Sequence, residues 1–280
     1  MELSKEKELK RPLIEWTPIY SMWLREIIRF FGQRSRVIGA IIQPFLFLGL
    51  MAIPMSRLMP PEAEGLMEQM FGGLNFFSYL VPGMVGVGLL FSGVMGGVSV
   101  LWDKEFGFLK EVMVAPVRRV SLMVGRSLGN MTVGICQALL TVGVACLFGI
   151  WYEFGIASAL GFLQAFVFMI LTYAVFIGLG LTMGGVFGDT EGFMTIVQVM
   201  QMPLLFLSGA FVPIDRLAGV PVLYQLQFIN PLTYGIDGIR ASLTGAEPFF
   251  PIWVDFAVVI GFAILFLALG TWRFERMEVS

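Results

Sequence analysis

Six long stretches of apolar residues, almost free of charged side chains, constrain the fold of this chain more than any other feature of its sequence. A helix needs about 20 mostly apolar residues to cross the hydrocarbon core of a bilayer. The six stretches run approximately over Val37–Met55, Phe77–Leu101, Leu122–Ile150, Ala159–Phe187, Phe193–Val212 and Ile252–Trp272. We therefore predict an all-α integral membrane protein with six transmembrane helices, organised as one transmembrane domain over residues 1–280.

The composition excludes several classes of protein. Hydrophobic residues make up 57% of the chain and charged residues 14%, whereas soluble domains have roughly 45–50% and 25%. The composition therefore argues strongly against a soluble enzyme. The net charge of −2 and the absence of a concentrated basic face argue against a nucleic-acid partner, because binding to phosphates requires clustered Lys and Arg.

The distribution of Lys and Arg predicts the orientation in the membrane, because short cytoplasmic loops retain these residues. Of the 18 Lys and Arg, eight precede the first stretch, five lie between the second and third (counting Arg126, just inside the third), and two follow the sixth. We therefore expect a multi-pass protein of the cell membrane with both termini in the cytoplasm. Residues 1–36 form the cytoplasmic N-terminus and contain no apolar core of a cleavable signal peptide.

Residues Ile19–Arg34 have the pattern of a helix that lies in the membrane interface. At 100° per residue, one face is apolar and aromatic and the other is polar. The predicted apolar face contains Tyr20, Trp23, Leu24, Ile27, Phe30 and Phe31, and the predicted polar face contains Arg25, Glu26, Arg29 and Gln33. The same pattern also fits a soluble helix packed on a partner subunit.

The connection at residues 102–121 predicts a short amphipathic helix on the cytoplasmic side. Asp103 is a candidate N-cap and Pro116 a stop signal. Apolar residues at helical spacing between them could contact another subunit; they are Phe108, Leu109, Val112 and Met113, followed by the pair Arg118 and Arg119. The alternative is a loop that carries its Arg residues for orientation alone.

The connection at residues 213–251 is too apolar for a loop in water and too interrupted by proline to cross the membrane. Asn230 followed by Pro231 is typical of a helix start, and Gly245 of a helix end, which predicts a helix over Pro231–Thr244. We expect this outer segment to dip into the outer leaflet without crossing it. Asp237 and Arg240 lie three residues apart and are predicted to pair on one helix face.

Small residues inside the stretches suggest close packing. Gly93 with Gly97, and Gly180 with Gly184, have the four-residue spacing that lets helices approach closely; packing within one subunit is the simpler interpretation and a dimer face the other. Cys136 and Cys146 lie ten helical residues, ~15 Å, apart. That separation is too large for a disulfide.

The apolar stretches contain few of the acidic and basic residues that catalytic sites use. Histidine is absent, no Asp or Glu lies in the second to fifth stretches, and Asp255 is the one carboxylate inside a stretch. No GxxxxGK[ST] phosphate-binding loop is present. We therefore predict no enzyme activity and no cofactor in this chain, and energy for transport would come from another subunit. An ion channel or ion-coupled carrier is the alternative, although carriers usually need intramembrane charges; a lipid-modifying membrane enzyme is a third.

Three motifs resemble a known family. They are KEFGFLKEVMVAPVRR at Lys104–Arg119, LSGAFVPIDRL at Leu207–Leu217 and INPLTYGIDGIR at Ile229–Arg240. In this order, with six apolar stretches around them, they resemble the permease subunit of type-two ATP-binding-cassette exporters. That family includes daunorubicin-resistance permeases and polysaccharide and teichoic-acid exporters. The chain departs from the usual coupling motif at Phe108 and Lys110.

The resemblance implies a fold and a set of partners. It implies an interfacial N-terminal helix, a coupling helix after the second span and re-entrant outer helices before the sixth. It implies a dimer of permeases, identical or different, on two cytoplasmic ATPase subunits that bind ATP and Mg²⁺. The substrate would be amphiphilic: a drug, a lipid or a lipid-linked glycan. The residues implied to contact the ATPase are Glu105, Phe108, Leu109, Glu111, Val112, Met113, Arg118 and Arg119, and the outer segment would be marked by Asn230, Pro231, Asp237 and Arg240.

Overall fold

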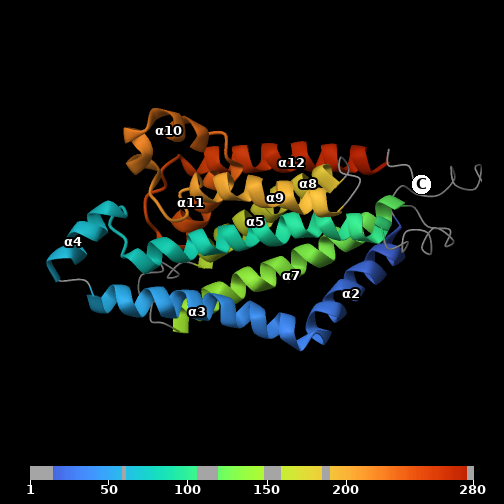
Figure 1. The fold of residues 1–280 in the computed structure, drawn as a ribbon, viewed down its shortest axis with the longest axis horizontal. Coiled ribbons are helices and arrows are strands. Elements are labelled where there is room, and N and C mark those ends of the chain that lie inside the picture. The colour runs from blue at the N-terminus through green and yellow to red at the C-terminus, as the bar shows by residue number, and fades with distance from the viewer. Residues whose placement is uncertain (1–14, 59–60, 106–118, 148–158, 185–189, 276–280) are drawn as a thin grey trace, which may run out of the picture.

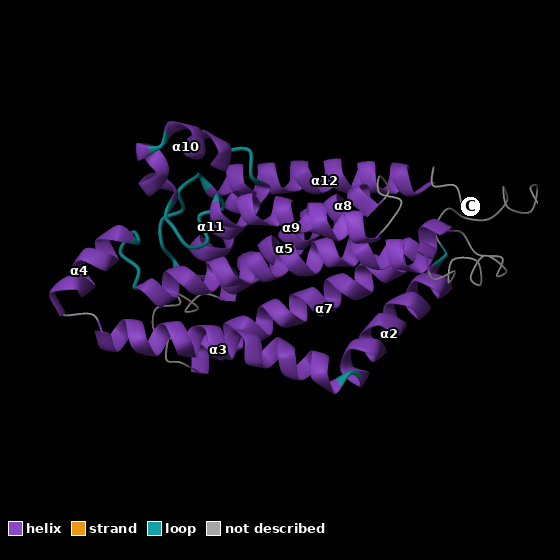
Figure 2. Cartoon of the chain, in the orientation of Figure 1, coloured by secondary structure: helices purple, strands orange, loops and turns teal. Residues whose placement is uncertain are grey.

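The computed structural model describes residues 15–58, 61–105, 119–147, 159–184 and 190–275. These residues form helices joined by loops and turns and contain no strand (Figure 2), which confirms the all-α class. The elements are α2 (Trp16–Gly32), α3 (Arg34–Leu58), α4 (Pro61–Met70), α5 (Phe76–Glu105), α7 (Arg119–Leu147), α8 (Ala159–Gly184), α9 (Thr190–Phe206), the 3-10 helix η2 (Ile214–Gly219), α10 (Pro221–Gln227), α11 (Pro231–Thr244) and α12 (Ile252–Glu275).

Four helices in the described part of the chain are long and apolar enough to cross a membrane. They correspond to the second, third, fourth and sixth predicted stretches, and their apolar portions are Phe76–Gly97, Ser121–Leu147, Ala159–Gly184 and Ile252–Arg273. The first and fifth stretches also form helices, but the apolar part of α3 is Val37–Leu50 and α9 has 17 residues. Four of the six predicted spans are thus supported among the described residues.

The long helices run lengthwise, and two short helical regions lie at opposite ends of the molecule. Figure 1 shows α3, α5, α7, α9 and α12 along the long axis, with α4, α10 and α11 at one end and α2 toward the other. We call these the α11 end and the α2 end. Helix α8 packs along both α5 and α12, and α11 packs against all three.

Glycines allow α5 and α8 to approach closely. A Cβ atom added at Gly97 would collide with the backbone of Gly180, and one at Gly93 would lie 2.8 Å from the Cβ of Phe176. The glycine spacing recognised in the sequence therefore serves packing within one chain.

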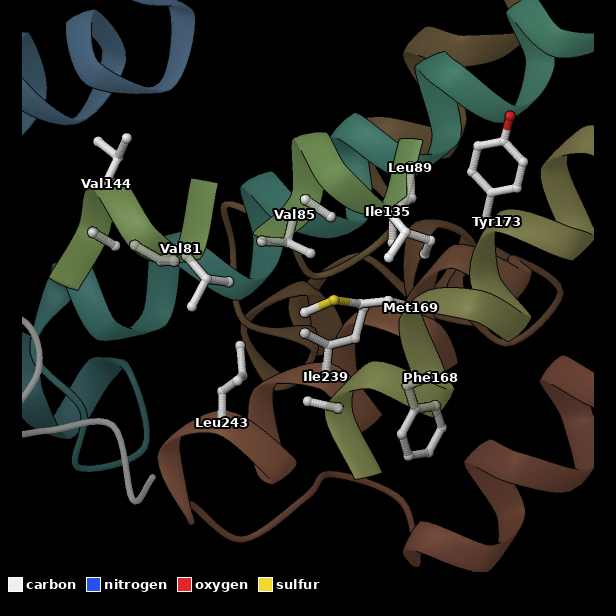
Figure 3. Close-up of a cluster of buried hydrophobic side chains, with 14 of the residues drawn as sticks. Val81, Val85, Leu89, Ile135, Val144, Phe168, Met169, Tyr173, Ile239 and Leu243 are labelled. Carbon is white, nitrogen blue, oxygen red and sulfur yellow. The ribbon is translucent and has the colours of Figure 1, made fainter. Parts of the chain in front are cut away.

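The buried core joins α5, α7, α8 and α11. Figure 3 shows Met169 of α8 beside Ile239 of α11, with Val85 of α5 nearby. Because α11 contributes core side chains rather than lying on the surface, this short helix is an integral part of the bundle.

Helix α7 carries both cysteines of the chain. Cys136 and Cys146 are partly buried and both are free. Their ten-residue spacing along one helix is too large for a disulfide.

Candidate functional site

Helix α11 begins and ends at the predicted residues. The side chain of Asn230 accepts a hydrogen bond from the backbone N–H of Leu232 at 3.0 Å, and Pro231 occupies the first helical position. Gly245 ends the helix with φ of +71°, a conformation that glycine adopts at low cost. Local sequence signals alone therefore define this helix.

Helix α11 is buried on all sides. Thirteen of its 14 residues are buried, and two glycines permit this packing. A Cβ atom at Gly235 would collide with the Thr172 side chain, and one at Gly238 with the ring of Phe168. A helix in this position must satisfy its charged side chains within the protein.

Arg240 is held by backbone carbonyl groups and an aromatic ring. Its Nη2 donates to the carbonyl of Gly209 at 2.8 Å and to that of Tyr79 at 3.5 Å. The guanidinium carbon lies 3.7 Å from the centroid of the Tyr79 ring, and the Tyr79 hydroxyl also donates to Gly209, at 2.6 Å. We call Tyr79, Gly209 and Arg240 the Arg240 clamp; it links α5, the turn after α9, and α11.

Asp237 binds a different element from Arg240. Its Oδ2 accepts the backbone N–H of Phe250, in the segment before α12, at 3.0 Å. The predicted ion pair between Asp237 and Arg240 is therefore wrong: each side chain is directed to backbone groups of another segment. Burial raises the pKa of Asp237, against the opposing effects of its backbone hydrogen bonds and the charge of Arg240.

The start of α11 is tied to the end of α9. Asn230 Nδ2 donates to the carbonyl of Leu204 at 2.8 Å, and Thr233 Oγ1 donates to that of Leu207 at 3.2 Å. Between α9 and α11 the chain forms η2 and α10, for which the sequence analysis gave no bounds. Pro221 at the first position of α10 is a signal that could have revealed it.

Helix α2 packs closely on α7 at the other end of the molecule. A Cβ atom at Gly125 would lie 2.5 Å from the carbonyl oxygen of Ile19. The indole N–H of Trp23 donates to Thr132 Oγ1 at 3.1 Å, and the backbone N–H of Glu15 donates to Ser121 Oγ at 3.1 Å. We call this contact between α2 and the first half of α7 the α2–α7 joint.

A buried ion pair lies inside the α2–α7 joint. Arg126 Nε lies 3.9 Å from Glu26 Oε1, and the two side chains are 5% and 6% exposed. Arg25, which is partly exposed, also contacts this oxygen: its Nη2 lies 3.4 Å from Glu26 Oε1. The prediction that Glu26 lies on a polar face is therefore wrong: Glu26 is buried, where its charge and that of Arg126 offset each other.

The exposed face of α2 keeps an interfacial character. The buried residues are Ile19, Met22, Glu26 and Phe30, so the predicted division into two faces holds only in part. Large apolar side chains remain exposed on the helix; they are Trp16, Tyr20, Ile28 and Phe31.

Most residues predicted to contact an ATPase lie outside the described residues. These are Phe108, Leu109, Glu111, Val112, Met113 and Arg118. Glu105 ends α5 and Arg119 begins α7, and nothing is described of their side chains. The two helix ends that flank the segment lie toward the α2 end (Figure 1), opposite α11.

No group of three or more His, Cys, Asp or Glu side chains that could hold a metal ion occurs within the described ranges. Asp237 and Arg240 at the α11 end bind backbone groups, and Glu26 and Arg126 at the α2 end bind each other.

Comparison with protein families identifies the class. The model of the ABC-2 type transporter family matches residues 17–244, which is most of the chain, and the chain therefore belongs to this family. It is a permease subunit of ABC-2 type transporters, as predicted from the three sequence motifs.

Individual relatives carry consistent names. The chain is 26% identical over 266 residues to a putative transport permease ycf38 of Porphyra purpurea, covering 85% of this chain and 81% of the relative. It is 22% identical over 251 residues to the probable doxorubicin resistance permease DrrC of Mycobacterium tuberculosis, covering 85% and 79%. It is 27% identical over 169 residues to the probable multidrug permease YbhR of Escherichia coli K12, covering 59% and 43%.

Proposed function

We propose that this chain is the membrane subunit of an exporter that moves an amphiphilic substrate outward from the cytoplasm or the inner leaflet. The family match over residues 17–244 carries the proposal. The names of two relatives, which refer to doxorubicin resistance and to multidrug transport, support an apolar drug or lipid as the substrate class. A lipid-linked glycan has the same amphiphilic chemistry.

Hydrolysis of ATP takes place in separate cytoplasmic subunits under this proposal. The chain contains no GxxxxGK[ST] loop, so it does not bind the nucleotide phosphates through that motif. The segment at residues 102–121 seats the permease on the ATPase, with Leu109 and Met113 as apolar contacts. Movement of the ATPase would then reach the ends of α5 and α7 directly, because these helices flank the segment.

The proposed membrane arrangement has six spans, with α3 and α9 as the first and fifth. Both termini and the α2 end face the cytoplasm, and the α11 end faces outward. Helix α11 is then a re-entrant helix at the exit of the substrate pathway, in a dimer of two permease chains. Its complete burial and its 14-residue length support this role, since ~20 residues are needed to cross.

Reconstitution with the candidate ATPase tests the coupling proposal. Each apolar contact is worth ~1.5–3 kcal/mol, so Leu109→Asp and Met113→Asp should reduce copurification of the ATPase or abolish substrate-stimulated hydrolysis and export. Gln225→Asp, at an exposed position of α10, is the control and should leave both unchanged. Normal hydrolysis and export in both segment variants would contradict the coupling role.

A further inference from the structure

Asp255, in the first turns of α12, is a buried carboxyl group without a bonding partner. Its exposure is 0%, and neither carboxylate oxygen has a hydrogen-bond partner. Asp255 also takes part in no ion pair among the described residues. Glu26, at the other end of the molecule, is paired with Arg126. The permease mechanism described above assigns it no role.

Among the residues that the structure describes, no positively charged group acts on Asp255. Asp255 interacts electrostatically with two ionisable groups of α11, Asp237 and Tyr234. Arg240 is directed away, to the carbonyl of Gly209. Helix α8, which packs along α12, contains no charged residue.

An ionised carboxylate in such a place is very unfavourable. An isolated buried charge costs far more than a hydrogen-bonded polar group, and the usual outcome is neutralisation by a proton. The carboxyl group of Asp237 also acts on Asp255, and a like charge disfavours the ionised form further. A bound Mg²⁺ or Ca²⁺ would need about six oxygen ligands, and no acidic cluster of three is described around Asp255.

We propose that Asp255 is a proton-binding site: its carboxyl group holds a proton while α11 and α12 are packed together. When the two helices separate and water enters, the carboxyl O–H bond breaks, the proton passes to water and a carboxylate remains. Opening of the α11 end would then release a proton. This link to opening rests on the proposed function, whereas the protonated state does not.

Infrared difference spectroscopy of the purified full-length chain in lipid nanodiscs at neutral pH tests the site without any ATPase or substrate. The spectrum of the wild type minus that of Asp255→Asn should show the C=O stretch of a neutral carboxylic acid. Asp255→Glu should shift this band without removing it. Asp215→Asn is the control, because Asp215 is a 62% exposed carboxylate at the same end, and its difference spectrum should show only a carboxylate band.

Thermal unfolding gives a second measurement. Asn has nearly the shape of the neutral acid, so Asp255→Asn should keep its melting temperature within ~2 °C of the wild type, a change of under about 1 kcal/mol. The proposal would be overturned if the neutral-acid band were missing from the difference spectra of both Asp255→Asn and Asp255→Glu. A carboxylate band, with stability that rises with sodium or potassium concentration, would also overturn it and would indicate a bound metal cation.

Discussion

Helices α11 and α2 are both short, carry charged residues and pack against long helices, yet they bury those charges in different ways. In α11, Asp237 and Arg240 bind backbone groups of other segments, and the helix is surrounded by protein. In α2, Glu26 binds Arg126 of α7 and also the surface residue Arg25, while Tyr20 and Phe31 stay exposed.

The difference has a physical consequence for movement. The hydrogen bonds of α11 reach α5, the end of α9 with the turn after it, and the segment before α12. Helix α11 therefore cannot shift without breaking several of them. Helix α2 is joined mainly to α7, and the two can move as one unit. The α11 end is therefore expected to open only when several of these hydrogen bonds break, whereas the α2–α7 joint can transmit motion without breaking its own contacts.

The largest effect is expected from Arg240→Ala. The substitution removes charged hydrogen bonds and a cation–π contact with Tyr79, worth together roughly 3 kcal/mol. Thermal unfolding in nanodiscs should show a clear loss of stability. The matched control is Arg216→Ala, since Arg216 is 46% exposed and 4.0 Å from Asp215, and it should change stability by less than ~1 kcal/mol. If the two substitutions lowered the stability equally, the Arg240 clamp would not contribute to it.

A somewhat smaller effect is expected from Glu26→Gln. The variant keeps the size of the side chain but removes the carboxylate that faces buried Arg126, at a cost of about 2 kcal/mol. Glu68→Gln, at an exposed position of α4, is the control and should be neutral. A melting temperature for Glu26→Gln that matches the control would mean that the ion pair contributes little to the α2–α7 joint.

Gly125→Ala tests the close approach of α2 and α7. The added methyl group would lie 2.5 Å from the carbonyl oxygen of Ile19, so α2 must shift, at a cost of about 1–2 kcal/mol. Gly143→Ala on the same helix has open space around it and should be neutral or stabilising, because Ala favours helix over Gly. If only Gly125→Ala reduces ATPase-coupled export, the α2–α7 joint transmits motion during transport. If both alanine variants behave alike, the joint has no such role.

The smallest effect is expected from Asn230→Ala, which removes the N-cap of α11 and the bond to Leu204. Loss of an N-cap costs ~1 kcal/mol. Asn230→Ser should restore the cap but not the second bond, and so should recover part of the stability. If Asn230→Ala unfolds at the wild-type temperature, surrounding packing rather than the cap holds α11 in place.

Features with local causes were predictable from the sequence. Asn230, Pro231 and Gly245 lie within or next to α11 and define its ends, and uninterrupted apolar length predicted the four long helices. The pairing of Asp237 with Arg240 and the exposure of Glu26 were predicted wrongly, because the groups they contact are distant in sequence. Gly209, for example, lies 31 residues from Arg240. Helical periodicity places a side chain on a face but does not say what lies opposite that face.

Chemical labelling in intact cells tests most directly the central claim that α11 is a buried helix at the outer end. In a background lacking Cys136 and Cys146, single cysteines would replace exposed Glu68 of α4 and buried Ser242 of α11. A large, membrane-impermeant thiol reagent should label the cysteine at position 68 rapidly and the one at position 242 very slowly, although both lie at the α11 end. Equally rapid labelling at the two positions would contradict the buried helix, and protection of position 68 would contradict the outward orientation.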